Sequence, residues 1–248
     1  MLPDESELYE TVFQRYEIKY ELDKEQYDAV MTGMMKYMEE DIYGESIIRN
    51  IYFDTDDFRL VRRSLEKPDY KEKLRLRCYS QVGLHDDVFM ELKKKYAGIV
   101  YKRRTVMKEY QALEYVRTGE LPGRDQVSRE IDYFGRFYQT LKPRVYISYD
   151  RTGYVGKDDP LLRITMDRDI MYRTRELDLL KGPAGKRIFP ADRYLMEVKV
   201  RYGVPVWLSR ILSEKHIVPT SFSKYGTAFT DMLITGAGQV PVTRYKSA

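Results

Sequence analysis

The sequence predicts an α+β fold, in the form of a closed antiparallel β-barrel of about eight strands with helices packed outside it. Short segments with two-residue polar and apolar alternation recur along the chain, separated by segments with helical spacing. Several of the predicted strands carry their charged residues on one face only. An even-numbered meander that closes on itself also leaves no exposed strand edge. A two-layer α+β sandwich is the alternative arrangement of the same elements.

Length and composition limit the class of protein. The chain has 248 residues, of which 43% are hydrophobic and 33% charged, so it can form a sizeable core. Its net charge of +4 is too small to indicate a general nucleic-acid coating. A single cysteine, Cys78, excludes an internal disulfide and a cysteine-based zinc site. With only two histidines, histidine-based catalysis has little to draw on.

The chain shows no sign of targeting or of repeats. Its first ten residues, MLPDESELYE, are acidic and are not followed by an apolar run, and no stretch reaches the roughly 18 apolar residues of a membrane span. We therefore expect a cytoplasmic protein without a transmembrane segment of its own. No internal repeat or low-complexity linker divides the sequence, which predicts a single domain over residues 1–248.

The first half of the chain is mostly β-structure. Residues 13–21 are predicted as a strand, followed by a helix that begins after the N-cap Asp23 and runs to about residue 40. Residues 50–55 and 73–79 are predicted as further strands. Residues 88–94 and 101–107 are predicted as a strand pair joined by a turn around Gly98.

Helical segments interrupt and then end the β-structure. The pattern near residues 108–141 predicts a helical insertion of two helices, broken by Leu-Pro-Gly at 121–123. Strands are predicted again at 144–151, 161–167 and 194–200. Two terminal helices are predicted near 205–235, the first over residues 205–213 and the second over 223–234.

The stretch KLRLR at 73–77 suggests which strand face looks inward. In a strand, Lys73, Arg75 and Arg77 share one face, while Leu74 and Leu76 share the other. For one strand alone, a solvated charged face is the simpler explanation. Helices outside a barrel, however, need an apolar strand face to pack against, which would turn the charged faces into the lumen. The other strands with same-face charges contain Glu17 and Lys19, Glu91 and Lys93, Arg163 and Asp167, and Glu197 and Lys199.

A basic lumen of this kind requires an anionic ligand. Two like charges about 4 Å apart at an effective dielectric near 20 repel by about 4 kcal/mol. Arginine makes planar two-point contacts to phosphate oxygens and lysine supplies a compact point charge, so their mixture favours a chain of phosphates. The sequence contains no glycine-rich phosphate loop, and side chains would therefore do the binding.

Nine stretches, in this order along the chain, resemble the VTC-type polyphosphate polymerase domain of the triphosphate tunnel (CYTH-like) superfamily. They are RYEIKY at 15–20, IYFDT at 51–55, LEKPDYKEKLRLRCY at 65–79, FMELKKK at 89–95, YKRR at 101–104, ISYDRTGY at 147–154, LRITMDRDI at 162–170, LMEVKV at 195–200 and PTSFSKYG at 219–226. The superfamily's first strand carries Glu-x-Glu-x-Lys, whereas this chain has Arg15-x-Glu17-x-Lys19. The missing first acid favours the VTC branch over the triphosphatases.

The resemblance implies a set of functional residues and a metal. The phosphate-binding residues would be Lys19, Arg75, Arg77, Lys93, Lys102, Arg151, Arg163, Lys199, Ser223 and Lys224. Glu197 would bind Mn²⁺ or Mg²⁺. The residues acting directly on the transferred phosphate would be Lys199, Lys224 and Glu197.

The implied activity is transfer of the γ-phosphate of ATP to a growing inorganic polyphosphate chain inside the basic tunnel. ATP and polyphosphate are the expected partners, no nucleic acid is expected, and the sequence indicates no particular protein partner. One alternative is a metal-dependent tripolyphosphatase or nucleoside triphosphatase, in which Glu17 or Glu91 would position water. Another is a non-catalytic polyphosphate-binding module.

Overall fold

The structure is a computed structural model that describes residues 16–97, 99–121, 123 and 125–236. The described residues form two compact units, which are treated separately below. Unit 1 contains residues 16–45, 151–168 and 192–221. Unit 2 contains the described residues of 46–150, 169–191 and 222–236. Within these ranges, every helix is too short or too polar to cross a membrane.

The described residues form a ten-stranded antiparallel sheet and six helices. The strands are β1 (Tyr16–Leu22), β2 (Met38–Asp54), β3 (Tyr70–Cys78), β4 (Asp87–Tyr96), β5 (Ile99–Lys108), β6 (Lys142–Gly156), β7 (Arg163–Arg173), β8 (Lys186–Arg187), β9 (Tyr194–Val200) and β10 (Pro219–Thr220). The helices are α1 (Lys24–Met34), α2 (Arg59–Leu65), α3 (Glu109–Thr118), α4 (Gln126–Tyr138), α5 (Val206–Glu214) and α6 (Lys224–Ile234).

The strand order confirms an antiparallel, β-rich α+β fold. It is β10-β1-β9-β7-β6-β2-β3-β4-β5, with β8 paired to β7. The order has two ends, at β10 and β5, and no pairing joins these ends in the described part of the chain. Closure of the predicted barrel is therefore not confirmed. The prediction of a single domain over residues 1–248 also stays a prediction.

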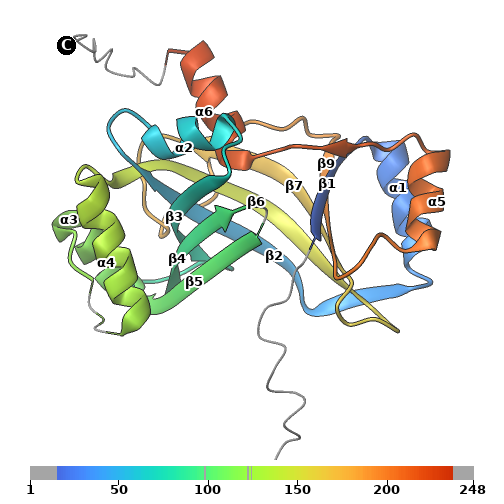
Figure 1. Cartoon of the computed structure of the whole chain (residues 1–248), viewed down its shortest axis with the longest axis horizontal. Coiled ribbons are helices and arrows are strands. Elements are labelled where there is room, and N and C mark those ends of the chain that lie inside the picture. Colours follow the sequence, from blue (N-terminus) through green and yellow to red (C-terminus); the bar gives the residue numbers. More distant parts are fainter. Residues whose placement is uncertain (1–15, 98, 122, 124, 237–248) are drawn as a thin grey trace, which may run out of the picture. The chain divides into compact units, whose positions relative to one another are not determined.

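In unit 1, α1 and α5 lie side by side over the apolar face of β1 and β9 (Figure 1). Tyr20 and Leu22 of β1 and Val198 of β9 are buried in this core together with residues of both helices. The predicted N-cap of α1 is confirmed, because the Asp23 carboxylate accepts a hydrogen bond from the backbone N–H of Gln26 at 2.8 Å. The charged residues of β1 and β9 alternate with these core residues and occupy the opposite face.

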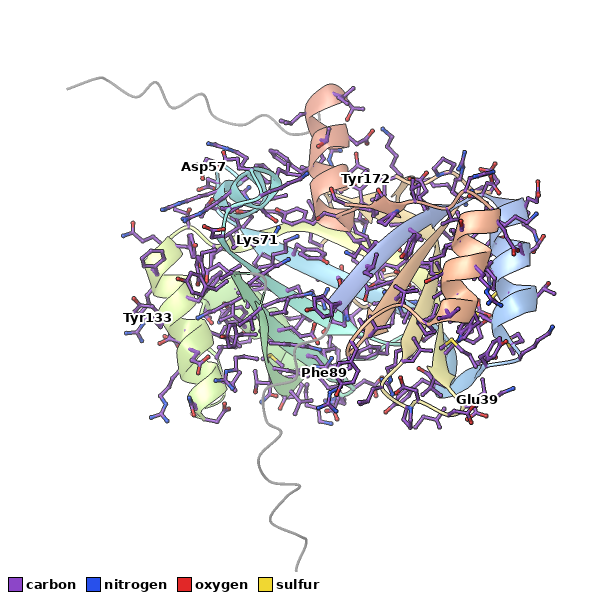
Figure 2. All side chains as sticks on the ribbon, turned by 45° about the vertical axis from the view of Figure 1, so that its right-hand side comes forward. Glu39, Asp57, Lys71, Phe89, Tyr133 and Tyr172 are labelled. Atoms are coloured by element: carbon purple, nitrogen blue, oxygen red, sulfur yellow. The ribbon has the colours of Figure 1, made fainter. Side chains whose placement is uncertain are left out.

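In unit 2, α3 and α4 lie beside β4 and β5 (Figure 1). Leu74 and Leu76 of β3 are 0% and 1% exposed, in one core cluster with Ile131 and Phe134 of α4. Tyr133 points away from the sheet on the outer side of α4 (Figure 2). The predicted orientation of KLRLR is therefore confirmed, since the leucines face helices and the arginines occupy the other side of the strand.

The predicted boundary between the first helix and the second strand was wrong. Helix α1 ends at Met34 and strand β2 begins at Met38. Residues 38–40, predicted as helix, and residues 41–49, predicted as neither helix nor strand, therefore belong to one long strand with the predicted strand at 50–55. Most residues from 39 to 47 are exposed, and Gly44 has a left-handed φ of 57°. A strand segment without a buried face has no two-residue alternation to reveal it. Residues 13–15 of the first predicted strand and Gly98 of the predicted turn lie outside the described residues.

The short elements α2, β8 and β10 were not predicted from the sequence. Helix α2 has only seven residues and starts after Phe58, which has a φ of 57°. The backbone N–H groups at its amino end have a hydrogen-bond partner outside the helix. The Asp54 carboxylate accepts hydrogen bonds from the N–H groups of Leu60 and Val61 at 2.8 and 3.0 Å. A cap supplied by a residue several positions upstream leaves no local capping signal in the sequence.

A buried carboxyl group in unit 2 makes stability depend on pH. Glu109, the first residue of α3, is 0% exposed. Burial raises the pKa of Glu109 to about 7, the Leu179 N–H opposes part of this rise, and the Asp178 carboxylate adds to it. The folded state therefore holds a proton that the unfolded state has released between about pH 4.5 and 7. The contribution of this proton to the free energy of unfolding is fully present below this window and is lost as pH rises through it.

We expect Glu109→Gln to remove this loss. At about pH 8 the free energy of unfolding of the variant should exceed that of the wild type by roughly 1–3 kcal/mol. At about pH 3 the two proteins should be nearly equal, because the wild-type carboxyl is then protonated in both states. Urea unfolding at the two pH values measures the difference. A constant difference at both pH values would contradict the assignment.

Candidate functional site

The first candidate site lies on the charged face of β3, β4 and β5 in unit 2. Glu91 of β4 is 1% exposed and is surrounded by cations. Its Oε2 lies 2.6 Å from Arg75 Nη2, and its Oε1 lies 2.8 Å from Lys102 Nζ and from Arg104 Nε. Arg77 Nη1 lies 4.0 Å from Oε2. Burial raises the pKa of Glu91, but the nearby cations outweigh burial and hold it far below its usual range. One ionised carboxylate thus faces four cations.

Three lysines lie directly opposite one another in the next row of the same face. Lys73 of β3 pairs in register with Lys93 of β4, which in turn pairs with Lys102 of β5. Side chains directly opposite in antiparallel strands lie on the same face at about 5 Å between Cβ atoms, and like charges there are destabilising. An anion bound across the row would relieve this repulsion.

Hydroxyl and amide oxygens hold the two arginines of β3 in place. Arg77 Nε donates to the Asn50 side-chain oxygen at 2.7 Å, and its Nη2 donates to the Tyr149 hydroxyl at 3.1 Å. Arg75 Nη1 donates to the Tyr52 hydroxyl at 3.3 Å. These acceptors orient the guanidinium groups without neutralising them, so the arginines are pre-oriented for an anionic ligand.

The amino end of α6 adjoins the same face. Ser223 is the N-cap residue of α6, and its Oγ accepts from the Gly226 N–H at 3.2 Å and from Lys73 Nζ at 3.2 Å. Lys224 Nζ lies 4.3 Å from the ring centre of Tyr149, the tyrosine that also holds Arg77. The predicted residues Ser223 and Lys224 are therefore brought to the Arg75 and Arg77 cluster. A helix amino end adds a favourable potential for anions.

The second candidate site lies on the charged face of unit 1. Register places Glu17 of β1, Lys199 of β9 and Arg163 of β7 in one row, and Lys19, Glu197 and Thr165 in the next. Glu197 Oε1 lies 2.8 Å from Lys199 Nζ, and its Oε2 lies 3.9 Å from Lys19 Nζ. Burial raises the pKa of Glu197, whereas Lys199, Arg151 and Lys19 together hold it far below its usual range. Glu197 is therefore ionised.

Arg151 has a buried acidic partner that the sequence analysis did not pair with it. Its Nε and Nη2 donate to the two oxygens of Asp167 at 2.6 and 2.7 Å, and Asp167 is 0% exposed. This two-point contact fixes the arginine on the same face as Glu197. Phosphate binding by Arg151 stays a prediction, and it would use the guanidinium edge that does not face Asp167.

Metal binding by Glu197, on the charged face of unit 1, stays a prediction. Among the described residues, no group of three or more His, Cys, Asp or Glu side chains forms a ready metal cage. Mg²⁺, however, is commonly bound by one or two carboxylates together with substrate phosphates and water. Glu197 is ionised and has Glu17 as its neighbour across Lys19, which lies 3.7 Å from Glu17. These two carboxylates suit a hard divalent cation.

The predicted residues thus fall into two sets. Those of unit 2 are Arg75, Arg77, Lys93, Lys102, Ser223 and Lys224, and those of unit 1 are Lys19, Arg151, Arg163, Glu197 and Lys199. The sequence analysis missed Arg104, although two-residue alternation from Lys102 places it on the same face. It also did not include Asn50 and Tyr52, which only the register between β2 and β3 brings opposite Arg77 and Arg75.

Two solved structures have a fold similar to that of this chain. One is a candidate adenylate cyclase from Bacillus halodurans, which is 16% identical with a TM-score of 0.52 and covers 84% of this chain and 92% of its own. Another is a candidate adenylyl cyclase from Hippeastrum, described as having a dominant triphosphatase activity. It is 16% identical with a TM-score of 0.50 and covers 90% of this chain and 96% of its own. The class that these similarities show is the fold itself, the antiparallel, β-rich α+β fold described above.

Within this class, the sequence identifies the family. The family model of the VTC domain matches residues 14–233, so the chain belongs to the VTC domain family. A comparison with curated proteins found no significant match. The resemblance to the VTC domain noted in the sequence is thereby confirmed.

Proposed function

We propose that this protein is a polyphosphate polymerase that transfers the γ-phosphate of ATP to the end of an inorganic polyphosphate chain. The observation that carries the proposal is the lysine row formed by Lys73, Lys93 and Lys102. It adjoins Arg75 and Arg77, whose neighbour Glu91 is shared among several cations. Such a concentration of positive charge on one strand face favours the binding of a polyanion.

The chemistry of this transfer matches the groups on the two charged faces. Phosphoryl transfer passes through a loose transition state and needs mainly in-line positioning and neutralisation of charge. The arginines and lysines of each face would bind phosphate oxygens and neutralise their charge. The nucleophile is already a phosphate oxygen, so the reaction needs no general base.

Glu197 is the residue that would bind the divalent metal, with Glu17 as its neighbour. A bound Mg²⁺ or Mn²⁺ would neutralise charge on the phosphate oxygens. Before that, Glu197 is held by Lys199 at 2.8 Å, so this lysine would move from the carboxylate to phosphate when the metal and substrate bind. Enclosure of the substrate in a tunnel is likewise a part of this proposal.

Hydrolysis is the second candidate function, because the similar Hippeastrum protein is described by a triphosphatase activity. A triphosphatase would need a carboxylate to position water. Glu91 is poorly suited, since its two oxygens contact Arg75, Lys102 and Arg104. Glu17 is the better candidate, with a side chain that is 29% exposed and lies 3.7 Å from Lys19 Nζ.

Incubation of the protein with ATP and Mn²⁺ or Mg²⁺ tests these functions. Gel electrophoresis of the products would detect long polyphosphate chains, and a colorimetric assay would detect free phosphate. We expect chains to accumulate. Phosphate release without chains would support the triphosphatase, and binding of tripolyphosphate without turnover would support the non-catalytic binding module.

Glu197→Gln is expected to lower metal-dependent turnover by about 10²-fold or more, a loss similar to that of one strong electrostatic contact at a reacting group. Metal-free tripolyphosphate should bind the variant at least as tightly as the wild type, because the change removes a negative charge. Turnover at several metal concentrations and calorimetry without metal measure the two effects. Equal loss of metal-free binding would instead indicate that Glu197 supports the fold of the site.

A further inference from the structure

Tyr52 of β2 is a buried tyrosine whose hydroxyl lies among the cations of unit 2. Its side chain is 7% exposed, and its hydroxyl lies 3.3 Å from Arg75 Nη1. The Tyr52 ring stacks on the ring of Tyr225, with centres 4.8 Å apart and planes at 21°. Tyr225 is fixed in turn, since its hydroxyl donates to Asp54 Oδ2 at 2.9 Å. The Tyr52 hydroxyl is therefore held beside the guanidinium of Arg75.

The charged and titratable groups around Tyr52 and its neighbours Arg75, Tyr225 and Tyr149 come from five elements. They are Asp54 on β2, Lys73, Arg75 and Arg77 on β3, Glu91 on β4, Tyr149 on β6, and Lys224 and Tyr225 on α6. Burial raises the pKa of Tyr52, but the positive charges of Arg75, Arg77 and Lys73 outweigh burial and lower it to about 8. The Asp54 carboxylate accepts hydrogen bonds from the Tyr225 hydroxyl and from backbone N–H groups of α2. Glu91 forms ion pairs with cations that include Lys102.

We propose that Tyr52 is a switchable counter-anion that competes with phosphate for Arg75. When its hydroxyl is protonated, Arg75 keeps its full positive charge for the ligand. When the hydroxyl has released its proton to solvent, the phenolate oxygen pairs with Arg75 and repels a phosphate beside it. Tyr52 is thus a positioning residue of the proposed site, and the inference rests on the proposed binding of phosphate by Arg75.

The expected consequence is a fall in phosphate affinity at alkaline pH. Bound phosphate favours the protonated hydroxyl and so raises the pKa of Tyr52, which means that binding takes up a proton. The affinity for phosphate is then highest below about pH 8 and falls as pH rises through this value. If Tyr52 regains an ordinary tyrosine pKa near 10 in the bound state, the fall is about tenfold between about pH 7 and 9. Tripolyphosphate releases its own last proton in the same pH range. That contribution is common to the wild type and Tyr52→Phe, so the difference between the two proteins reports the titration of Tyr52.

Two measurements on the whole protein test the proposal, with Tyr52→Phe as the variant. The first is a pH titration followed by the ultraviolet absorption of tyrosinate. The second is calorimetry with metal-free sodium tripolyphosphate at about pH 7 and about pH 9. Tyr154→Phe is the matched control, because Tyr154 is also a buried tyrosine, it belongs to unit 1, and burial raises its pKa to about 12.

We expect one tyrosine to titrate near pH 8 in the wild type and in Tyr154→Phe, and none in Tyr52→Phe. Tripolyphosphate should move this titration upward, and its affinity should fall between the two pH values except in Tyr52→Phe. Tripolyphosphate binding with the same pH dependence in all three proteins would overturn the switch while leaving the proposed function intact. Absence of tripolyphosphate binding at about pH 7 would overturn both the proposed function and the role of Tyr52 toward phosphate. This would hold even if Tyr52 were seen to titrate near pH 8.

Discussion

Replacement of Arg75 and Arg77 together by alanine is expected to lower tripolyphosphate affinity by about 10²–10⁴-fold and to abolish turnover. Each arginine supplies a hydrogen bond between charged groups, which contributes about 1.5–3 kcal/mol. The fold should survive, because Glu91 keeps Lys102 at 2.8 Å and Arg104 at 2.8 Å as partners. Calorimetry with tripolyphosphate and the ATP assay measure the two losses, and circular dichroism checks the fold.

Arg103→Ala is the matched control for this double change. Arg103 lies between Lys102 and Arg104 on β5, so its side chain points to the other face of the strand. There it pairs with Glu130 of α4 at 3.4 Å and is 54% exposed. The control should bind tripolyphosphate as the wild type does. If the control and the double variant lose affinity equally, the assigned binding face is wrong.

Glu91→Gln is expected to destabilise the protein by about 3–5 kcal/mol in the absence of ligand, the usual cost of removing one partner from a buried group of charges. Arg75, Lys102 and Arg104 would then repel one another with no buried carboxylate between them. Tripolyphosphate should restore much of the loss, because it supplies negative charge to the same cations. Thermal unfolding with and without tripolyphosphate measures both effects.

Glu130→Gln is the control for the stability measurement, because Glu130 makes its ion pair with Arg103 at the surface of α4. Exposed pairs contribute about 0–1 kcal/mol, so this variant should unfold close to the wild type. A Glu91→Gln variant that is destabilised but gains no more than the wild type from tripolyphosphate would show that the polyanion does not occupy these cations.

The orientation of the strands could be predicted because each strand face carries one kind of residue. Leu74 and Leu76 need an apolar partner, and the predicted helical insertion supplied one, in the form of α3 and α4. The same logic placed Lys19 and Glu197 on the charged face of unit 1. Hydrophobic periodicity contains this information locally, since burial of one face is the same requirement at every second residue.

Other features could not be predicted from local patterns. The first half of β2 has no buried face, and the cap of α2 comes from Asp54 outside the helix. The partners of the site residues were also hidden, because Asp167 and Arg151 are separated by sixteen positions and meet only through the pairing of the strands. The low pKa of Tyr52 likewise depends on cations of a neighbouring strand.

The sequence by itself determined the family, through the VTC-domain match over residues 14–233. Residue type and two-residue spacing determined the antiparallel α+β class and the faces on which the cations lie. Only the tertiary structure decided how those cations are balanced. Strand register sets three lysines in one row and brings four cations around Glu91. The energy of these interactions depends on the distances between the charges, and those distances are fixed only when the strands pair.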